Sequence, residues 1–332
     1  MKILIISLSN LGDAILTSPA IEEVRQKYPQ AAMHVLASPN TAELFSGDPR
    51  FSRVLVWEKS ASLVGQLRRV LQLIGQRYSL VVDFKNTLIP IFLIGAKRTP
   101  LRRKPNASVH RIEQHLSLLD SIGIPRPAQL PLLPFGAEES AAVEKWLSST
   151  GNGGSSRIVV IVPGAKSHLK RWSPKKFAEV ADRLAAEQRM KILLVGGPED
   201  KPEADAVRRA MQQPALDLAG QTSLRQLAAL LSNAELVITN DTANLHAAQA
   251  MRVPTLAIFG PTDEKKYGPR HPNSAVVRKN LVCSPCEKAL CAYNHECMEW
   301  ITADEVYSSA LKLLNTLPVR PELVEGRKAG EK

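Results

Sequence analysis

Hydrophobic and polar positions along the chain follow two alternating patterns. Short, almost continuously apolar runs are typical of strands buried on both faces, and longer stretches with apolar residues three or four apart are typical of helices packed on such strands. In the first half, the runs that predict strands are 2–8, 33–37, 54–57 and 80–84. The segments that predict helices there are 18–28, 63–74, 112–122 and 139–147. Ser18 and Pro19 suit the cap and first turn of the first helix.

The second half repeats this alternation. Strands are predicted at 157–162, 191–195, 236–239 and 255–259. Helices are predicted at 174–186, at 223–231, between the last two strands, and from 302 to 317. Ser223 with Gln226, and Thr302 with Glu305, have the spacing of capping boxes. Strands that alternate with helices predict parallel sheets with right-handed crossovers.

A run of nine small or polar residues, 148–156, separates the two halves and has the composition of a flexible linker. We therefore expect two doubly wound, Rossmann-like α/β domains that face a cleft, one over 1–150 and one over 157–317. Ligands in this architecture bind beyond the carboxyl ends of the strands. The charged segment 318–332, punctuated by proline and glycine, is expected to be disordered.

Composition places the chain among soluble globular proteins. Of its 332 residues, 44% are hydrophobic and 23% are charged, which excludes disorder, collagen and coiled coil as global descriptions. No apolar run is as long as a membrane-spanning helix requires, which is about 18 residues. Gly12 and Asp13 interrupt the first apolar stretch, so we interpret 2–8 as a strand rather than a signal peptide. We expect a cytoplasmic protein whose cysteines are reduced or bound to metal.

Positive charge is clustered. The net charge is +11, and segment 85–111 holds seven basic residues and no acidic one. A second cluster consists of Lys166, Lys170, Arg171, Lys175 and Lys176. Each cluster is either a solvated face or a site for an anionic partner such as phosphate, nucleic acid or an acidic membrane surface. Aromatic residues are only 5% and are not interleaved with the basic ones, which disfavours nucleic acid.

The first candidate site follows the first strand. Gly12 permits a tight turn there, and Asp13 is placed at the carboxyl end of the strand, facing the cleft. A carboxylate at this position can accept a proton from an incoming hydroxyl group. The alternative is that Asp13 caps the following helix. The single glycine disfavours a dinucleotide-binding fingerprint.

Two further stretches join a strand end to a helix start in the second half. In 163–174, backbone N–H groups and the helix dipole favour an anion, and Lys170 suits a diphosphate. The alternative is an exposed basic loop; Trp172 is expected to pack at the helix entrance. In 239–248, Asp241 and Thr242 fall at a helix N-terminus, and His246 lies one turn further on the same face. Phosphate would repel Asp241, so we expect that residue to hydrogen-bond backbone or a sugar hydroxyl.

The cysteines form a local cluster. Cys283, Cys286, Cys291 and Cys297 can supply four thiolates to a structural zinc ion, with His295 as a further ligand. Ordinary buried thiols are the alternative, because the second pair is spaced too widely for a standard zinc ribbon.

The motifs described above occur in the same order, along roughly residues 1–315, as in a known family. With this order the chain resembles the glycosyltransferase family 9 heptosyltransferases, which build the inner core of lipopolysaccharide. The matching residues are Ser9, Gly12, Asp13, Ser18 and Pro19; Lys170, Arg171 and Trp172; Leu218, Ala219, Gly220, Ser223 and Leu224; Asp241, Thr242 and His246; and Phe259, Gly260, Pro261 and Thr262. Each motif is weak alone, and the ordered set is specific.

The resemblance implies a GT-B fold whose second domain binds ADP-L-glycero-D-manno-heptose. It also implies an anionic, lipid-linked acceptor, the lipid A–Kdo precursor, that approaches from the first domain at the inner leaflet. Asp13 would be the catalytic base, and the donor site would include Lys170, Glu199, Thr222, Asp241, Thr242 and His246. Glu199 would lie near the ribose and Thr222 near the adenine. The acceptor side would include Gly12, Lys97, Arg98, Arg102 and Arg103.

The implied reaction is an inverting displacement with no catalytic metal or other cofactor, since no D-x-D motif occurs in the chain. Ala243 replaces a glycine usual in the family, which leaves the donor sugar open. Two alternatives follow: a family 9 transferase with another nucleotide sugar or acceptor, and a nucleotide- or polyanion-binding module without turnover. Positive charge alone would favour peripheral association with the anionic inner leaflet.

Overall fold

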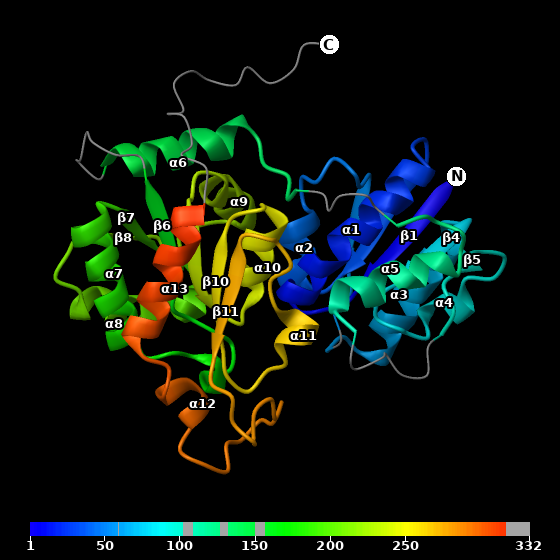
Figure 1. Ribbon diagram of the computed structural model, residues 1–332. Coiled ribbons are helices and arrows are strands. Elements are labelled where there is room, and N and C mark those ends of the chain that lie inside the picture. Colours follow the sequence, from blue (N-terminus) through cyan, green and yellow to red (C-terminus); the bar gives the residue numbers. More distant parts are fainter. Residues whose placement is uncertain (59, 102–108, 127–131, 150–156, 317–332) are drawn as a thin grey trace.

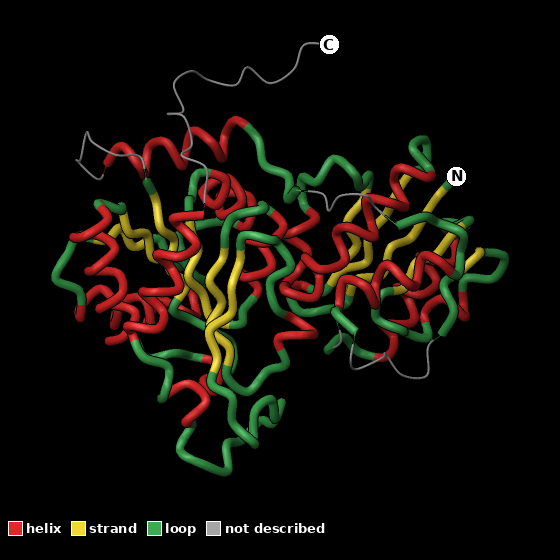
Figure 2. Tube along the Cα trace, in the orientation of Figure 1, coloured by secondary structure: helices red, strands yellow, loops and turns green. Residues whose placement is uncertain are grey.

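The computed structural model describes residues 1–58, 60–101, 109–126, 132–149 and 157–316 and contains two parallel sheets, one per domain (Figure 1). The first sheet has five strands in the order β3-β2-β1-β4-β5, and the second has six in the order β11-β10-β9-β6-β7-β8. Figure 2 shows both groups of strands flanked by helices. The expected α/β class and the parallel pairing are confirmed.

The elements of the first domain follow a strict alternation near its N-terminus. Its strands are β1 (Lys2–Ser7), β2 (Ala32–Ala37), β3 (Arg53–Val56), β4 (Leu80–Asp83) and β5 (Lys97–Arg98). Its helices are α1 (Leu11–Lys27), α2 (Pro39–Phe45), α3 (Leu63–Gly75), α4 (Ile89–Phe92) and α5 (Arg111–Asp120). Alternate residues of β1 point to opposite faces: Ile3 and Ile5 pack under α1 and α5, and Leu4 and Ile6 face the α3 side.

The second domain has the same design. Its strands are β6 (Ile158–Val162), β7 (Lys191–Leu194), β8 (Ala215–Asp217), β9 (Leu236–Asn240), β10 (Thr255–Phe259) and β11 (Ser274–Arg278). Its helices are α7 (Pro174–Gln188), α8 (Lys201–Ala210), α9 (Leu224–Ser232), α10 (Ala243–Ala250), α11 (Glu264–Tyr267), α12 (Glu296–Glu299) and α13 (Ala303–Thr316). Two 3-10 turns, His168–Lys170 and Pro198–Asp200, follow β6 and β7.

Most predicted boundaries agree with the structure to within a few residues, and both capping boxes are confirmed. Ser223 accepts the N–H of Gln226, whose side chain accepts the N–H of Ser223. Thr302 and Glu305 bond in the same reciprocal way. Each box satisfies N–H groups that have no partner within the helix.

The predicted start of the first helix is wrong. Helix α1 begins at Leu11, and Pro19 lies inside it. The Ser18-Pro19 pair has the sequence of a helix start, but the preceding turns bury Ala14, Ile15 and Leu16 on the sheet and are held there by packing. Gly12 is consequently a helical residue and not a turn residue.

Helix α6 (Ala137–Ser149) precedes the linker in sequence, yet it packs against α9 of the second domain (Figure 1). One apolar core runs from α1 and α5 in the first domain to α9 and α10 in the second. Residues 150–156 of the expected linker and the expected disordered tail, 318–332, lie outside the described residues. The domain boundary therefore stays a prediction.

Candidate active site

The site lies where the two domains meet, at the carboxyl ends of β1, β6 and β9. Helices α1 and α10 begin there, and their first turns are in contact. A Cβ on Gly12 would lie 3.0 Å from Cδ2 of His246 and 3.4 Å from Cα of Ala243. Gly12 therefore lets the two helix starts approach closely, so that unpaired N–H groups of both domains border the same space.

Asp13 stands in the first turn of α1, and its carboxylate forms an ion pair with Arg111, the first residue of α5. Oδ1 of Asp13 lies 3.6 Å from Nε of Arg111, and about one fifth of each side chain is exposed. The residue that precedes the helix as its N-cap is Asn10, so the alternative that Asp13 is this cap is wrong. Asp13 is thus a partly accessible carboxylate held by a guanidinium group.

Lys170 and Asp241 form an ion pair in the second domain at this place. Nζ of Lys170 donates to Oδ2 of Asp241 over 2.6 Å, and the Asp241 side chain is 6% exposed. The sequence did not predict this pair, and the expected hydrogen bond of Asp241 to a sugar hydroxyl stays a prediction. A buried carboxylate needs such a partner, and the partly exposed ammonium remains accessible from the cleft.

Helix α10 places two more of the expected residues. Thr242 is its N-cap, and the Thr242 hydroxyl accepts the N–H of Asn244. His246 is buried, and burial lowers its pKa, while the carboxylates of Asp241 and Asp13 act in the opposite direction. The imidazole is consequently neutral at physiological pH.

The loops of the second domain are fixed by buried polar side chains. The Asn240 amide donates to the carbonyl of Pro163 and accepts the N–H of Trp172. Trp172 is buried against Phe177, as expected for a packing residue. Asp200 accepts the N–H of Gly197, and burial raises the pKa of its carboxyl group.

Glycines let Asp200 reach this position. A Cβ on Gly164 would lie 2.0 Å from Oδ1 of Asp200, and one on Gly196 would lie 2.7 Å from its Cβ. The loops after β6 and β7 therefore close around one carboxyl group.

The expected ribose and adenine residues lie on neighbouring loops. Glu199 is exposed in the turn after β7, and Thr222 is half-buried before α9. The N–H of Gly220 donates to the carbonyl of Gly196, which joins the two loops. Gly220 has a φ of +74°, and a Cβ there would lie 3.2 Å from Cα of Pro198.

Two of the expected basic residues of the first domain, Lys97 and Arg98, lie two strands away from β1 and are not beside Asp13. Lys97 and Arg98 form β5 at the edge of the sheet, where β4 separates them from β1. Nζ of Lys97 donates to the carbonyl of Ile122, and Nη1 of Arg98 donates to that of Pro90. Arg102 and Arg103 lie outside the described residues.

Two site residues were missed by the sequence reasoning. Arg111 was counted only as the end of the basic stretch, although it pairs with Asp13. Tyr267 ends α11, and burial raises the pKa of its phenol, with the charges of Arg111, Asp13 and Asp241 all acting on it. Its position follows from the path of the chain after β10 and has no local sequence signal.

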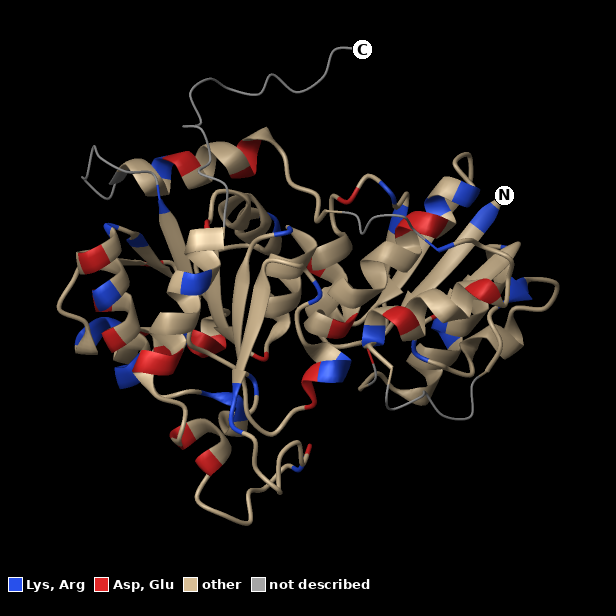
Figure 3. Ribbon diagram, viewed as in Figure 1, with Lys and Arg blue, Asp and Glu red and all other residues tan. Residues whose placement is uncertain are grey.

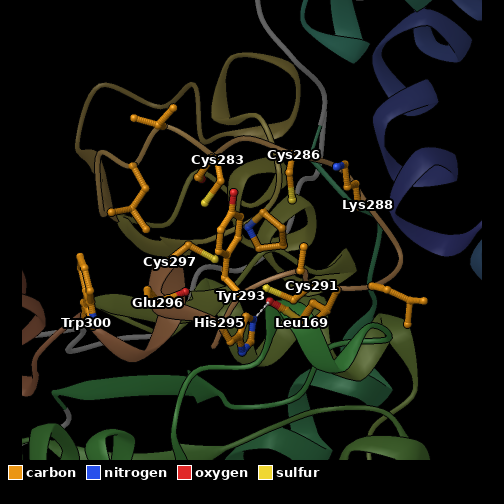
Figure 4. A pocket seen from close by; sticks show the side chains of 16 residues that line it. Leu169, Cys283, Cys286, Lys288, Cys291, Tyr293, His295, Glu296, Cys297 and Trp300 are labelled. Atoms are coloured by element: carbon orange, nitrogen blue, oxygen red, sulfur yellow. Dashed lines mark hydrogen bonds between the residues drawn. The ribbon is translucent and has the colours of Figure 1, made fainter.

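The structure does not support the zinc alternative for the cysteine cluster. The four cysteines border a cavity of about 540 Å³ together with Tyr293 (Figure 4). Cys291 is exposed, whereas Cys297 is buried. A Cβ on Gly260 would lie 3.2 Å from Sγ of Cys297, so the thiol packs closely against the backbone there. Burial raises the pKa of the Cys297 thiol to about 11. Among the described residues, no three His, Cys, Asp or Glu side chains are arranged to hold a metal ion.

Within the described part of the chain, none of the helices combines the length and apolar character needed to cross a membrane.

Comparison with known proteins gives a consistent result. Residues 97–296 match the family model described as glycosyltransferase family 9 (heptosyltransferase). Lipopolysaccharide heptosyltransferase 3 of Escherichia coli K12 is 27% identical over 285 residues, which cover 78% of this chain and 82% of that protein.

Two solved structures have similar folds. The glycosyl transferase family 9 protein of Veillonella parvula superimposes with a TM-score of 0.79 at 22% identity, covering 95% of this chain and 97% of that one. The ADP-heptose lps heptosyltransferase II of E. coli superimposes with a TM-score of 0.75, also at 22% identity, covering 95% and 99%.

Proposed function

The chain belongs to glycosyltransferase family 9, the heptosyltransferase family, and on that basis we propose that it moves a heptose from ADP-L-glycero-D-manno-heptose to the lipid A–Kdo inner core of lipopolysaccharide. It is a glycosyltransferase with the expected GT-B fold. The observation that carries the proposal is the contact between the start of α1, which bears Asp13, and the start of α10, which follows the Asp241 that pairs with Lys170. A general base and a cation for the leaving group are the two parts that metal-independent glycosyl transfer requires.

The donor is assigned to the second domain. Lys170 and the N-terminus of α10 offer positive charge to the diphosphate, and Asp241 holds the ammonium group of Lys170 in place. Glu199 is assigned to the ribose hydroxyls and Thr222 to the adenine edge, which agrees with the joined loops that carry them. Thr242 and His246 border the sugar. The similarity to the ADP-heptose lps heptosyltransferase II of E. coli supports this choice of donor.

The reaction is an inverting displacement. Asp13 takes the proton of the acceptor hydroxyl as that oxygen bonds to the anomeric carbon. The bond from this carbon to the diphosphate oxygen breaks at the same time, and ADP leaves with its negative charge stabilised by Lys170. Arg111 orients the Asp13 carboxylate before the step.

The acceptor is assigned to the first domain and is anionic. Gly12 borders the acceptor side next to Asp13. A positive field that attracts phosphate and Kdo carboxylates is contributed by Lys97, Arg98, Arg102 and Arg103. Hydrogen bonds to backbone carbonyls hold the side chains of Lys97 and Arg98 in place. Their charges can act on the acceptor through this field without touching the sugar. We expect the enzyme to work at the inner leaflet as a peripheral protein.

The test is donor-dependent thermal stabilisation followed by transfer. ADP-heptose should raise the melting temperature of the purified protein more than UDP- or GDP-sugars do, because a ligand bound only by the folded state stabilises it. ADP should then appear only when a lipid A–Kdo acceptor is added, with or without EDTA. Preference for another nucleotide sugar would favour the second candidate, a family 9 transferase with a different donor, which Ala243 supports. Stabilisation by ADP-sugar without turnover would indicate a binding module.

A further inference from the structure

Helix α3 turns its apolar side towards solvent. Leu63, Leu67 and Leu71 are 85%, 60% and 58% exposed, although they recur at the spacing of one helix face. Leu73 is the residue of this helix that is fully buried. An amphipathic helix on a globular domain normally packs this face on the core, and large exposed apolar patches mark interaction sites.

Helix α4 extends the same surface. It contacts α3, and Leu73 of α3 belongs to the same buried cluster as Ile89 and Leu93, so these residues anchor both helices to the sheet. Beside them, Ile91, Phe92 and Ile94 are 44%, 53% and 96% exposed. We call the exposed side chains of Leu63, Leu67, Leu71, Ile91, Phe92 and Ile94 the α3–α4 surface.

The segment of the chain that forms this surface is almost entirely basic in its charged residues. Between Glu58 and Glu113 the sequence contains many lysines and arginines and a single acid, Asp83. Asp83 is buried and accepts hydrogen bonds from the backbone N–H groups of Lys85 and Thr87, so it offers no negative charge to a partner. Arg68 and Arg69 lie on α3 itself. Figure 3 shows the Lys and Arg positions of the described residues in blue and the Asp and Glu positions in red.

The α3–α4 surface lies in the domain that carries Asp13. Strand β4 pairs with β1 in parallel, with Asp83 opposite Ile6, so both strands end at the edge from which α1 starts. Helix α4 follows β4 from this edge, and its Pro90 carbonyl accepts a hydrogen bond from Arg98.

We propose that the α3–α4 surface inserts into the interface of a bilayer that contains anionic lipids. Leucine, isoleucine and phenylalanine side chains supply the inserted area, and the surrounding arginines and lysines are attracted to the lipid phosphates. A second copy of the chain is disfavoured as the partner, because two such surfaces would bring like charges together. The inference rests on the proposed function in one respect, because the proposed function explains why this domain must reach an acceptor carried by a lipid.

The test is co-sedimentation of the full-length protein with vesicles. Vesicles of phosphatidylcholine with phosphatidylglycerol should bind the wild type, and Leu71→Glu should weaken this partitioning at least tenfold. Leu132→Glu is the matched control, because Leu132 is 49% exposed and lies beside Arg25 and Asp48, at a separate cavity of the first domain. Arg68→Gln with Arg69→Gln should weaken binding to the anionic vesicles and should leave the weaker binding to pure phosphatidylcholine unchanged.

Equal binding by wild type and Leu71→Glu would overturn the proposal. A second result would also overturn the proposal: the wild type does not bind vesicles, it sediments as a dimer, and Leu71→Glu dissociates that dimer. The surface would then join two copies of the chain. Melting temperatures of both glutamate variants should match the wild type, because neither leucine is buried.

Transfer assays separate this inference from the proposed function. Leu71→Glu should keep wild-type transfer to a detergent-dispersed acceptor and should lose most of the transfer to the same acceptor in vesicles. If neither protein transfers heptose at all, the proposed function fails, and the vesicle-binding result still decides the role of the surface.

Discussion

Gly12 of the first domain lies directly against His246 of the second. A Cβ at Gly12 would lie 3.0 Å from Cδ2 of His246, tighter than nine in ten real Cβ contacts, so the imidazole would have to shift by a few tenths of an ångström. The contact places the turn of α1 that carries Asp13 next to the first turn of α10. The relative position of the two domains is therefore part of the candidate site.

Gly12→Val should separate these turns and lower kcat at least tenfold, while the affinity for ADP changes little because Lys170, Glu199 and Thr222 do not contact Gly12. The measurement is steady-state transfer together with ADP titration. Gly75→Ala is a suitable control, since a Cβ there meets nothing within 4 Å. A wild-type kcat for Gly12→Val would show that the helix contact does not position the reacting groups.

Asp13→Asn should lower kcat by about 10²- to 10⁴-fold, the usual contribution of general base catalysis. The amide retains the shape of the side chain, so the melting temperature and the affinity for ADP should remain close to those of the wild type. Glu43→Gln, an exposed change on α2, provides the control for loss of one negative charge. Full activity of Asp13→Asn would exclude Asp13 as the base.

Lys170→Met should weaken ADP binding at least tenfold and should also destabilise the fold, because Asp241 would be buried without a partner. Adding Asp241→Asn should restore the melting temperature and leave ADP binding weak. Calorimetric titration and thermal unfolding of the single and double variants check both effects, with Lys175→Met as an exposed control. Recovery of ADP affinity in the double variant would mean that Lys170 has only a structural role.

His110 predicts an acid-sensitive domain contact. Its Nδ1 accepts the N–H of Ile112, so its Nε2 donates to the carbonyl of Gly268 in the second domain. Burial lowers the pKa of His110 from 6.5 to about 4. The neutral form is thus favoured by folding, and this stabilisation is complete above pH 6.5 and is lost as the pH falls towards 4.

His110→Gln should therefore flatten the dependence of the unfolding free energy on pH between about 6.5 and 4. Urea unfolding at several pH values measures this slope, and His168→Gln, at an exposed position, should retain the wild-type slope. Identical slopes for wild type and His110→Gln would contradict the assignment.

The fold was predictable where burial alone decides the local sequence. The strands β6, β9 and β10 are buried throughout, and β1 is buried after Lys2, so their apolar runs identify them directly. For β1, Gly12 and Asp13 had to exclude a signal peptide. Strands β5 and β8 and helix α4 have two to four residues each, too few for a periodic pattern, and neighbouring elements hold them in place. Pro19 misled the prediction because packing in α1 overrides its local preference.

The candidate site was predictable only as separate motifs. Asp13, Lys170 and Asp241 each follow a strand, and parallel topology brings such positions to one edge. The pairing of Lys170 with Asp241, 71 residues apart, depends on the adjacent order of β6 and β9, which no local pattern specifies. Arg111 reaches Asp13 through the packing of α5 on α1, a contact between faces of two helices.

The packing of helix α6 determines where the chain can be truncated to give a fragment that folds on its own. Its Val143 joins the same buried cluster as Leu227 and Leu230 of α9, and Glu139 pairs with Arg225 of α9 over 2.6 Å. A fragment that begins at Arg157 would leave this face of α9 bare to water and would aggregate. A fragment that begins near Leu133 carries its own cover and should fold alone, so the unit of autonomous folding starts before the linker that separates the two sheets.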